Sequence, residues 1–257
     1  LLVFGLFTLS LNVTLNAQKI DSCGGNPYRL SWSMELPLSL AALSTGISYL
    51  VLDAQTPILN QDQLQQFDRT QVPFFDRSAT YHWSPSAALA SDLLLYTSCA
   101  VPLSLLAAPK IRKDYLKITV LYAQTFALTA GLTALCKTLV KRPRPFVYNP
   151  SVPYSFKQEL SARYAFFSGH TSMSAALCFL SASIFQDYHP RHKAVPWLWT
   201  AAALVPALTG VLRVQAGKHY WSDVITGYLI GAGIGFCIPK LHKWLQKSNK
   251  KQLPVRF

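Results

Sequence analysis

Long apolar runs recur along this chain and restrict what it can fold into. A helix needs about 20 apolar residues to cross the hydrocarbon of a bilayer, and open strands in lipid would leave backbone groups unpaired. Six runs approach that length, and the last three are extended by adjoining motif or aromatic residues: Leu36–Leu52, Ser86–Ala108, Ile118–Cys136, Thr171–Phe185, Ala194–Leu212 and Val224–Ile238. They predict an all-α fold, a polytopic transmembrane bundle of about six helices.

The composition of the chain favours a membrane protein over a soluble one. Of its 257 residues, 51% are hydrophobic and only 14% are charged, which is unusual for a soluble protein of this size. The formal net charge is +13. A nucleic-acid binder would carry this charge on a polar, soluble face, whereas here Lys and Arg fall mostly in short stretches between apolar runs. We therefore expect a membrane and no nucleic acid as partner.

The charge of the connecting segments predicts the topology. Basic residues outnumber acidic ones in residues 109–117, in residues 187–193 and in the C-terminal tail. Alternating spans place these three segments on one side, which we expect to be the cytoplasm. Residues 53–83 and 141–167 then face outward. The second outward segment is itself basic, which a ligand-binding role would explain.

Three polar clusters stand at the outward ends of predicted spans. Lys137 to Pro145 closes the third run, Phe167-Ser168-Gly169-His170 opens the fourth, and Arg213 to Asp223 joins the last two. An even number of spans separates any two of these clusters. They are therefore expected on the same membrane face.

The cations of these clusters indicate an anion site. Lys137, Arg144 and Arg213 would be a costly arrangement at a membrane face unless an anion is present. The planar fork of Arg suits phosphate oxygens, and Lys adds a mobile point charge. Ser168 and Gly169 stand where a helix begins, and unpaired N–H groups and the positive end of the helix dipole favour an anion there. The clusters thus predict a phosphate site.

The histidines supply the chemistry for such a site. His219 and Asp223 are four residues apart, so they share a face if that segment is helical. The carboxylate can then accept from one ring nitrogen and leave the other free to attack phosphorus. His170 is a second imidazole, able to protonate the departing alkoxide and later activate water. Phosphoryl transfer mainly needs charge stabilisation and in-line positioning, so we expect no metal and no cofactor.

Several residues near the clusters keep two interpretations. Lys141, Arg142 and Lys218 either widen the phosphate site for a diphosphate or sugar phosphate, or anchor the chain at the lipid interface. Asp92, near the outward end of the second run, is either functional or the structural partner of an Arg. The five cysteines show no spacing typical of a zinc site.

In these motifs the chain resembles the type 2 phosphatidic acid phosphatase family, the integral-membrane branch of the phosphatase and vanadium haloperoxidase superfamily. The family signature is K-x6-R-P, then P-S-G-H, then S-R-x5-H-x3-D. It is matched over about Ile118 to Ile238 by Lys137, Arg144-Pro145, Ser168-Gly169-His170, Arg213, His219 and Asp223. Phe167 and Leu212 stand where the family usually has Pro and Ser. The first departure would loosen the phosphate loop or add a lipid contact, and neither replaces a catalytic group.

The resemblance implies a helical bundle with its site at the outer membrane boundary. It implies that His219 is the nucleophile that forms a phosphohistidine, Asp223 its partner and His170 the acid–base. Phosphate would be held by Lys137, Arg144, Ser168, Gly169 and Arg213. The expected localisation is the bacterial inner membrane, with the site facing the periplasm.

The expected function is therefore a metal-independent lipid-phosphate phosphatase. Its substrate would be an isoprenyl diphosphate, a phosphatidyl phosphate or a lipid-linked sugar phosphate. A vanadate-dependent haloperoxidase shares the anion pocket, but the apolar runs argue against it. A transporter or lipid-binding protein would not need His170, His219 and Asp223. The sequence leaves the lipid and the oligomeric state open.

Four regions follow from these predictions: an apolar leader at 1–17, an N-terminal helix and outward segment at 18–85, a membrane catalytic bundle at 86–245, and a basic cytoplasmic tail at 246–257. Leu1–Ala17 has the apolar character of a secretory signal but no basic leader. If this leader places the N-terminus outside, a crossing by Leu36–Leu52 would reverse the predicted side of every later segment. Either the leader does not cross, or the second stretch is re-entrant or interfacial.

Overall fold

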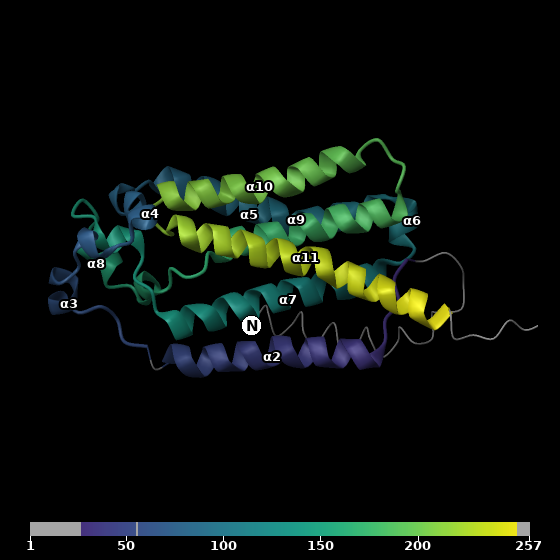
Figure 1. Ribbon diagram of the computed structural model, residues 1–257, viewed down its shortest axis with the longest axis horizontal. Helices are drawn as coiled ribbons and strands as arrows, with labels where there is room; N and C mark the ends of the chain where they lie inside the picture. The colour runs from purple at the N-terminus through teal and green to yellow at the C-terminus, as the bar shows by residue number, and fades with distance from the viewer. Residues whose placement is uncertain (1–26, 55, 251–257) are drawn as a thin grey trace, which may run out of the picture.

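The computed structural model describes residues 27–54 and 56–250, and all regular structure within them is helical. Six long helices lie along a common direction and form an elongated bundle (Figure 1). They are α2 (Trp32–Ala54), α5 (Pro85–Ser104), α7 (Tyr115–Val140), α9 (Gly169–Tyr188), α10 (Val195–Gln215) and α11 (Trp221–Lys250). The predicted all-α bundle is confirmed.

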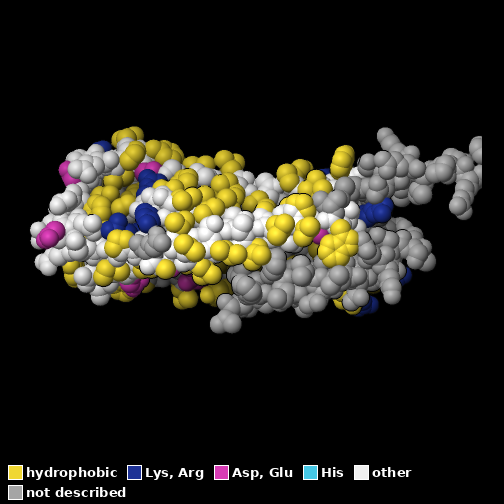
Figure 2. Space-filling model, turned by 90° about the horizontal axis from the view of Figure 1, so that it is seen from below, with side chains coloured by type: hydrophobic (Ala, Val, Ile, Leu, Met, Phe, Trp, Pro, Cys, Tyr) yellow, Lys and Arg dark blue, Asp and Glu magenta, His cyan; other side chains and the backbone are white. Residues whose placement is uncertain are grey.

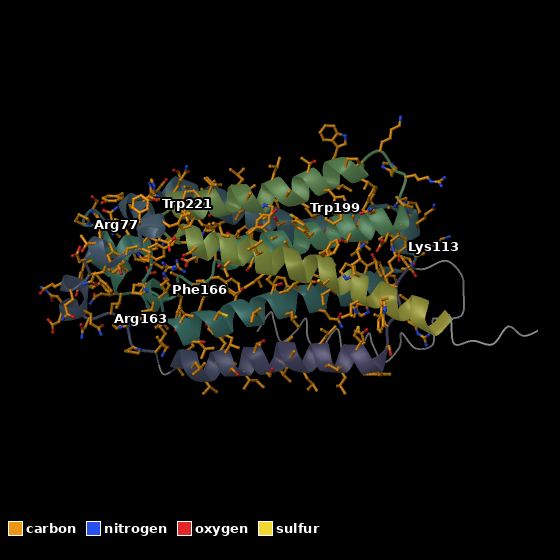
Figure 3. The ribbon with its side chains drawn as sticks, viewed as in Figure 1. Arg77, Lys113, Arg163, Phe166, Trp199 and Trp221 are labelled. Carbon is orange, nitrogen blue, oxygen red and sulfur yellow. The ribbon has the colours of Figure 1, made fainter. Side chains whose placement is uncertain are left out.

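Short helices cluster at the two ends of the bundle. One end, called the loop end below, carries the segments between α2 and α5 and between α7 and α9 (Figure 1). Their short helices are α3 (Gln61–Gln65), η1 (Arg69–Gln71), α4 (Phe74–Arg77), η2 (Ser78–Tyr81), η4 (Pro145–Tyr148), α8 (Tyr154–Lys157) and η5 (Leu160–Arg163). At the opposite end lie η3 (Leu105–Ala107) and α6 (Pro109–Arg112). Figure 3 accordingly places Arg77 and Arg163 at the loop end and Lys113 at the other.

Five of the long helices are long and apolar enough to cross a membrane, namely all but α9. The central position of α9 explains the exception, because it contacts α5, α7, α10 and α11. Its buried surface includes the hydroxyl residues Ser172, Ser174 and Ser181. A helix surrounded by other helices does not face lipid, so it tolerates polar side chains that pair within the bundle.

Helix α2 runs without interruption over 23 residues, so the stretch Leu36–Leu52 belongs to a helix long enough to span. It packs against α7. Near its start the buried side chain of Glu35 accepts a hydrogen bond from Gln124 of α7. His242 of α11 lies 3.0 Å from Gln124 Oε1 and joins this polar cluster. The predicted leader Leu1–Ala17 lies outside the described residues, as do residues 251–257 of the predicted tail, so the division into four regions stays a prediction.

Close packing of α11 on α9 brings the first turns of both helices together. Gly227, Gly231 and Gly235 recur every four residues along α11, and a Cβ on Gly231 would stand only 2.0 Å from the carbonyl oxygen of Ser172. Such small residues let helix backbones approach closely. Both helices begin at the loop end (Figure 1), where the Ser168 N–H donates to the Asp223 carbonyl at 3.1 Å.

Candidate active site

The three predicted clusters meet at the loop end, where α7 and α10 end and α9 and α11 begin. Helix α7 stops because Lys141 adopts the left-handed conformation (φ 48°) and Pro143 follows two residues later, which disfavours further helix. The chain then runs through η4, where the Phe146 N–H donates to the Gly217 carbonyl at 3.0 Å. This bond ties the first cluster to the loop that carries His219.

Lys137, Arg144 and Arg213 form the cationic part of the site. Lys137 stands in the last turn of α7, and a Cβ on Gly169 would lie 3.5 Å from its Nζ. Arg144 is buried, and its Nε has no hydrogen-bond partner within the described part of the chain. The same holds for Nε of the buried Arg213. Buried guanidinium N–H groups are normally paired, so these atoms fit an anionic ligand.

One carboxylate on α5 faces this group of cations. Asp92 Oδ1 lies 3.3 Å from Arg213 Nη1 and 2.7 Å from His170 Nε2. Asp92 therefore contacts an Arg and a predicted acid–base at once. Within 4.0 Å, no carboxylate of the described residues pairs with Lys137 or Arg144. These three cations therefore outnumber the carboxylate that pairs with them, which favours the binding of a phosphate anion.

His219 is buried and has a defined nearest acceptor. Its Nδ1 lies 2.7 Å from the backbone oxygen of Ala165 and 3.6 Å from Asp223 Oδ2. A carbonyl can only accept, so Nδ1 carries the proton and Nε2 keeps its lone pair. Burial, together with repulsion from Arg144, Arg213 and other cations, holds the pKa of His219 well below its usual value. The ring is therefore neutral at pH 7.

Asp223 is fully buried and has partners besides His219. Its Oδ2 accepts the Tyr220 N–H at 2.9 Å, and its Oδ1 lies 2.5 Å from Arg142 Nη1. In place of the predicted hydrogen bond, Asp223 and His219 make a longer contact of 3.6 Å, and the Ala165 carbonyl accepts the hydrogen bond from Nδ1. Sequence reasoning did not find Ala165, because a backbone acceptor leaves no signature in residue type.

Ser168 begins α9 as its N-cap. Its Oγ accepts from the Thr171 N–H at 3.4 Å and lies 2.9 Å from Thr171 Oγ1. Phe167, just before it, is fully buried and so makes no lipid contact. Figure 3 places the neighbouring Phe166 at the loop end, on the same side as Trp221 at the start of α11.

Lys218, next to His219, has aromatic neighbours. Its Nζ lies 5.0 Å from the ring centre of Trp83, 4.9 Å from that of Phe146 and 5.9 Å from that of Phe156. Burial and repulsion from Arg144 and other cations lower the pKa of Lys218 to about 8. Aromatic rings carry no net charge, so they stabilise the ammonium group without neutralising it.

An apolar groove of about 440 Å³ leads away from the cations between the long helices. Its polar end is formed by Lys137, Arg144 and Gly169. The rest of its wall is contributed by Tyr49, Leu95, Tyr96, Cys99, Phe126, Ala130, Thr133, Ala134, Tyr164 and Met173. Phe126 precedes Lys137 by 11 residues on α7, which corresponds to about 16 Å of helix. Within the described residues, no group of three or more His, Cys, Asp or Glu is arranged to hold a metal ion.

Comparisons with known proteins point to one family and one fold. The family model described as "PAP2 superfamily" matches residues 118–247, about half of the chain. Lipid A 4'-phosphatase of Porphyromonas gingivalis is 30% identical over 92 residues, which cover 34% of this chain and 35% of that protein. The match thus spans about a third of the relative's length. The crystal structure of a transmembrane PAP2 type phosphatidylglycerolphosphate phosphatase from Bacillus subtilis shares the fold, with a TM-score of 0.50 and 18% identity over 84% of this chain and 99% of that chain.

Proposed function

Because this chain belongs to the PAP2 superfamily and is an integral membrane protein, we propose that it is a lipid-phosphate phosphatase. The proposed reaction hydrolyses a phosphomonoester or diphosphate of a lipid through a phosphohistidine on His219. Candidate substrates are an isoprenyl diphosphate, a phosphatidyl phosphate and a lipid-linked sugar phosphate.

The observation that carries the proposal is the continuity of the apolar groove with the cations. The groove offers charge at one end, at Lys137 and Arg144, and apolar walls along about 16 Å of α7. An amphiphile with an anionic head matches both parts, whereas a small soluble phosphate would leave the apolar wall unused. On the face seen in Figure 2, Lys and Arg side chains likewise gather near the loop end beside apolar surface.

The phosphate group would bind among Lys137, Arg144 and Arg213, at the first turn of α9. It would satisfy the unpaired Nε atoms of both arginines and add the N-terminal N–H groups of α9 around Gly169 as donors. Charge that develops on the equatorial oxygens in the transition state would be stabilised by the same groups.

In the first chemical step, Nε2 of His219 forms a bond to phosphorus while the bond between phosphorus and the lipid oxygen breaks. His170 gives a proton to the leaving oxygen, and Asp92 Oδ1, 2.7 Å from His170 Nε2, holds this ring in place. In the second step, water attacks the phosphohistidine and its proton goes to His170. The phosphorus–nitrogen bond breaks, and inorganic phosphate leaves.

The reaction is tested by phosphate release from the full chain in detergent. The substrates are phosphatidic acid, phosphatidylglycerol phosphate, an isoprenyl diphosphate and lipid A, all in the presence of EDTA. His219→Ala should lower the rate at least about 10³-fold, because the nucleophile is lost. The matched control is His192→Ala. His192 is exposed and belongs to the segment between α9 and α10, which lies at the end of the bundle opposite the loop end (Figure 1), so this variant should keep the unmodified rate.

Labelled substrate should also leave phosphate on the protein in an alkali-stable, acid-labile form, and this label should be absent in His219→Ala. Full activity of His219→Ala, or a divalent metal required for the chemical step, would contradict the proposal. Halide oxidation that depends on added vanadate would instead support the haloperoxidase alternative. We further propose that the loop end faces the periplasm of a bacterial inner membrane, which cysteine labelling of Lys113→Cys and Arg163→Cys from outside would test.

A further inference from the structure

Arg142 lies between two buried carboxylates at the start of α11. Its Nη1 is 2.5 Å from Asp223 Oδ1, and its Nη2 is 2.8 Å from Asp76 Oδ2. The side chains of the two aspartates are only 0% and 5% exposed. Arg142 is therefore engaged with carboxylates, unlike Arg144 two residues later.

The surrounding residues hold this guanidinium in place. The ring of Tyr220 lies 3.9 Å from the Arg142 guanidinium carbon, and Ser222 Oγ accepts from Nη1 at 2.8 Å. Asp76 is itself held by Ser222, whose N–H donates to Oδ1 at 2.9 Å and whose hydroxyl donates to Oδ2 at 2.6 Å. A residue of the short helix α4 is thus bound to the first turn of α11, next to Asp223.

The charges of this cluster do not cancel. Two carboxylates and one guanidinium leave one net negative charge close to His219, and Asp223 Oδ2 brings it within 3.6 Å of Nδ1. If Asp76 were neutral, Arg142 would cancel the charge of Asp223 completely. Although burial alone raises it, the hydrogen bonds from Ser222 and Arg142 keep the pKa of Asp76 below its usual value. The carboxylate is therefore ionised at neutral pH.

We infer that Asp76 is a positioning residue for the reaction at His219: it offsets the charge of Arg142, so that the cluster with Asp223 keeps one net negative charge beside Nδ1. This inference rests on the proposed function. When phosphorus is bonded to Nε2 and a proton stays on Nδ1, the His219 ring carries a positive charge. A net negative charge beside Nδ1 stabilises this state relative to the neutral ring. Asp76 supplies that charge without touching substrate.

The first test replaces the charge of Asp76 and keeps its shape. Asp76→Asn should lower kcat about tenfold and leave KM nearly unchanged, because coupled charges in one network usually interact on this scale. Asp76→Glu keeps the charge and should retain most of the activity. The control is Asp62→Asn, an exposed aspartate in the same loop-end segment, which should behave as the unmodified chain. Unfolding midpoints in detergent show which variants are folded.

The second test separates charge from structural support. In Asp76→Asn with Arg142→Gln, Asp223 alone restores the net charge of −1, so kcat should rise above that of Asp76→Asn. A purely structural role predicts that the second substitution lowers kcat further.

The same variants are compared for vanadate binding, measured as protection against thermal unfolding. Asp76→Asn should bind vanadate about tenfold more weakly, because vanadate bonded to Nε2 also leaves the ring positive. If Asp76→Asn equals the unmodified chain in kcat and vanadate affinity, the inference is wrong while the proposed function stands. The inference is equally wrong if the double variant is no better than Asp76→Asn. If the unmodified chain releases no phosphate from any lipid, the proposed function fails, and the vanadate comparison still decides the role of Asp76.

Discussion

Substitution of Gly231 by alanine tests whether the contact between α9 and α11 sets the geometry of the site. A Cβ at this position would lie 2.0 Å from the carbonyl oxygen of Ser172. Ordinary contact begins near 3.4 Å, so the two backbones would have to separate by about 1.4 Å. The obstacle is backbone, which cannot rotate away as a flexible side chain can.

The expected cost has a structural and a catalytic part. Overpacking of a tight contact typically costs about 1–3 kcal/mol, while alanine gains about 1 kcal/mol of helix propensity over glycine. We therefore expect Gly231→Ala to be destabilised by up to about 2 kcal/mol. Ser172 lies one turn after Ser168 on α9, so a shift of this size would reach the phosphate site. A misplacement of about 1 Å can lower kcat about a hundredfold.

Gly233→Ala is the matched control, because it lies on the same helix and its Cβ would meet nothing within 4 Å. It gains the same propensity without a clash, so it should be at least as stable as the unmodified chain. Equilibrium unfolding in mixed micelles measures stability, and phosphate release measures kcat. If Gly231→Ala were as stable and as active as Gly233→Ala, the close approach of the two helices would not govern the site.

Three further predictions concern single positions. Gly217→Ala should lose about 1–3 kcal/mol of stability and most activity, because φ is +67° and the new Cβ would stand 2.3 Å from the His82 carbonyl; unfolding and phosphate release measure this. Ala130→Phe should narrow the groove and raise KM for long-chain lipids more than for a water-soluble ester. Leu139→Phe, on the exposed side of α7, should leave both KM values unchanged. The folded chain keeps His219 neutral because its pKa is lowered, whereas the unfolded chain protonates this histidine below about pH 6.5. The free energy of unfolding should therefore decrease as the pH is lowered. At about pH 5.5 this loss is at most about 1.4 kcal/mol, and a His219→Gln variant with an equally steep decline would refute the prediction.

The positions of the long helices were predictable because lipid imposes a simple requirement on residue type. The predicted stretches fall within α2, α5, α7, α9, α10 and α11, apart from a few residues at their ends. Helix α11 continues to Lys250, beyond the predicted end at Ile238. Apolar residues show which part of a helix faces lipid, and the helix can continue past this part with polar residues. The central α9 was found mainly by its flanking motif, since its serines lower the apolar signal.

The site was predictable in its members and less so in its contacts. Lys137, Arg144, Gly169 and Arg213 are brought to one end of the bundle, as the count of spans required. Of the residues left with two interpretations, Arg142 pairs with two carboxylates and Asp92 pairs with both Arg213 and His170. No spacing rule connects such partners, because they lie on different helices.

The sequence by itself determined which residues lie at the same membrane face, because each apolar run reverses the side of the chain. It also supplied the candidate reactive groups, since residue type decides which atoms are able to attack or bind phosphorus. Only the tertiary structure decided that the Ala165 carbonyl orients His219 and that Asp76 reaches Arg142. These contacts join residues 54 and 66 positions apart, and they exist only because the packing of α9 on α11 brings their helices and loops together.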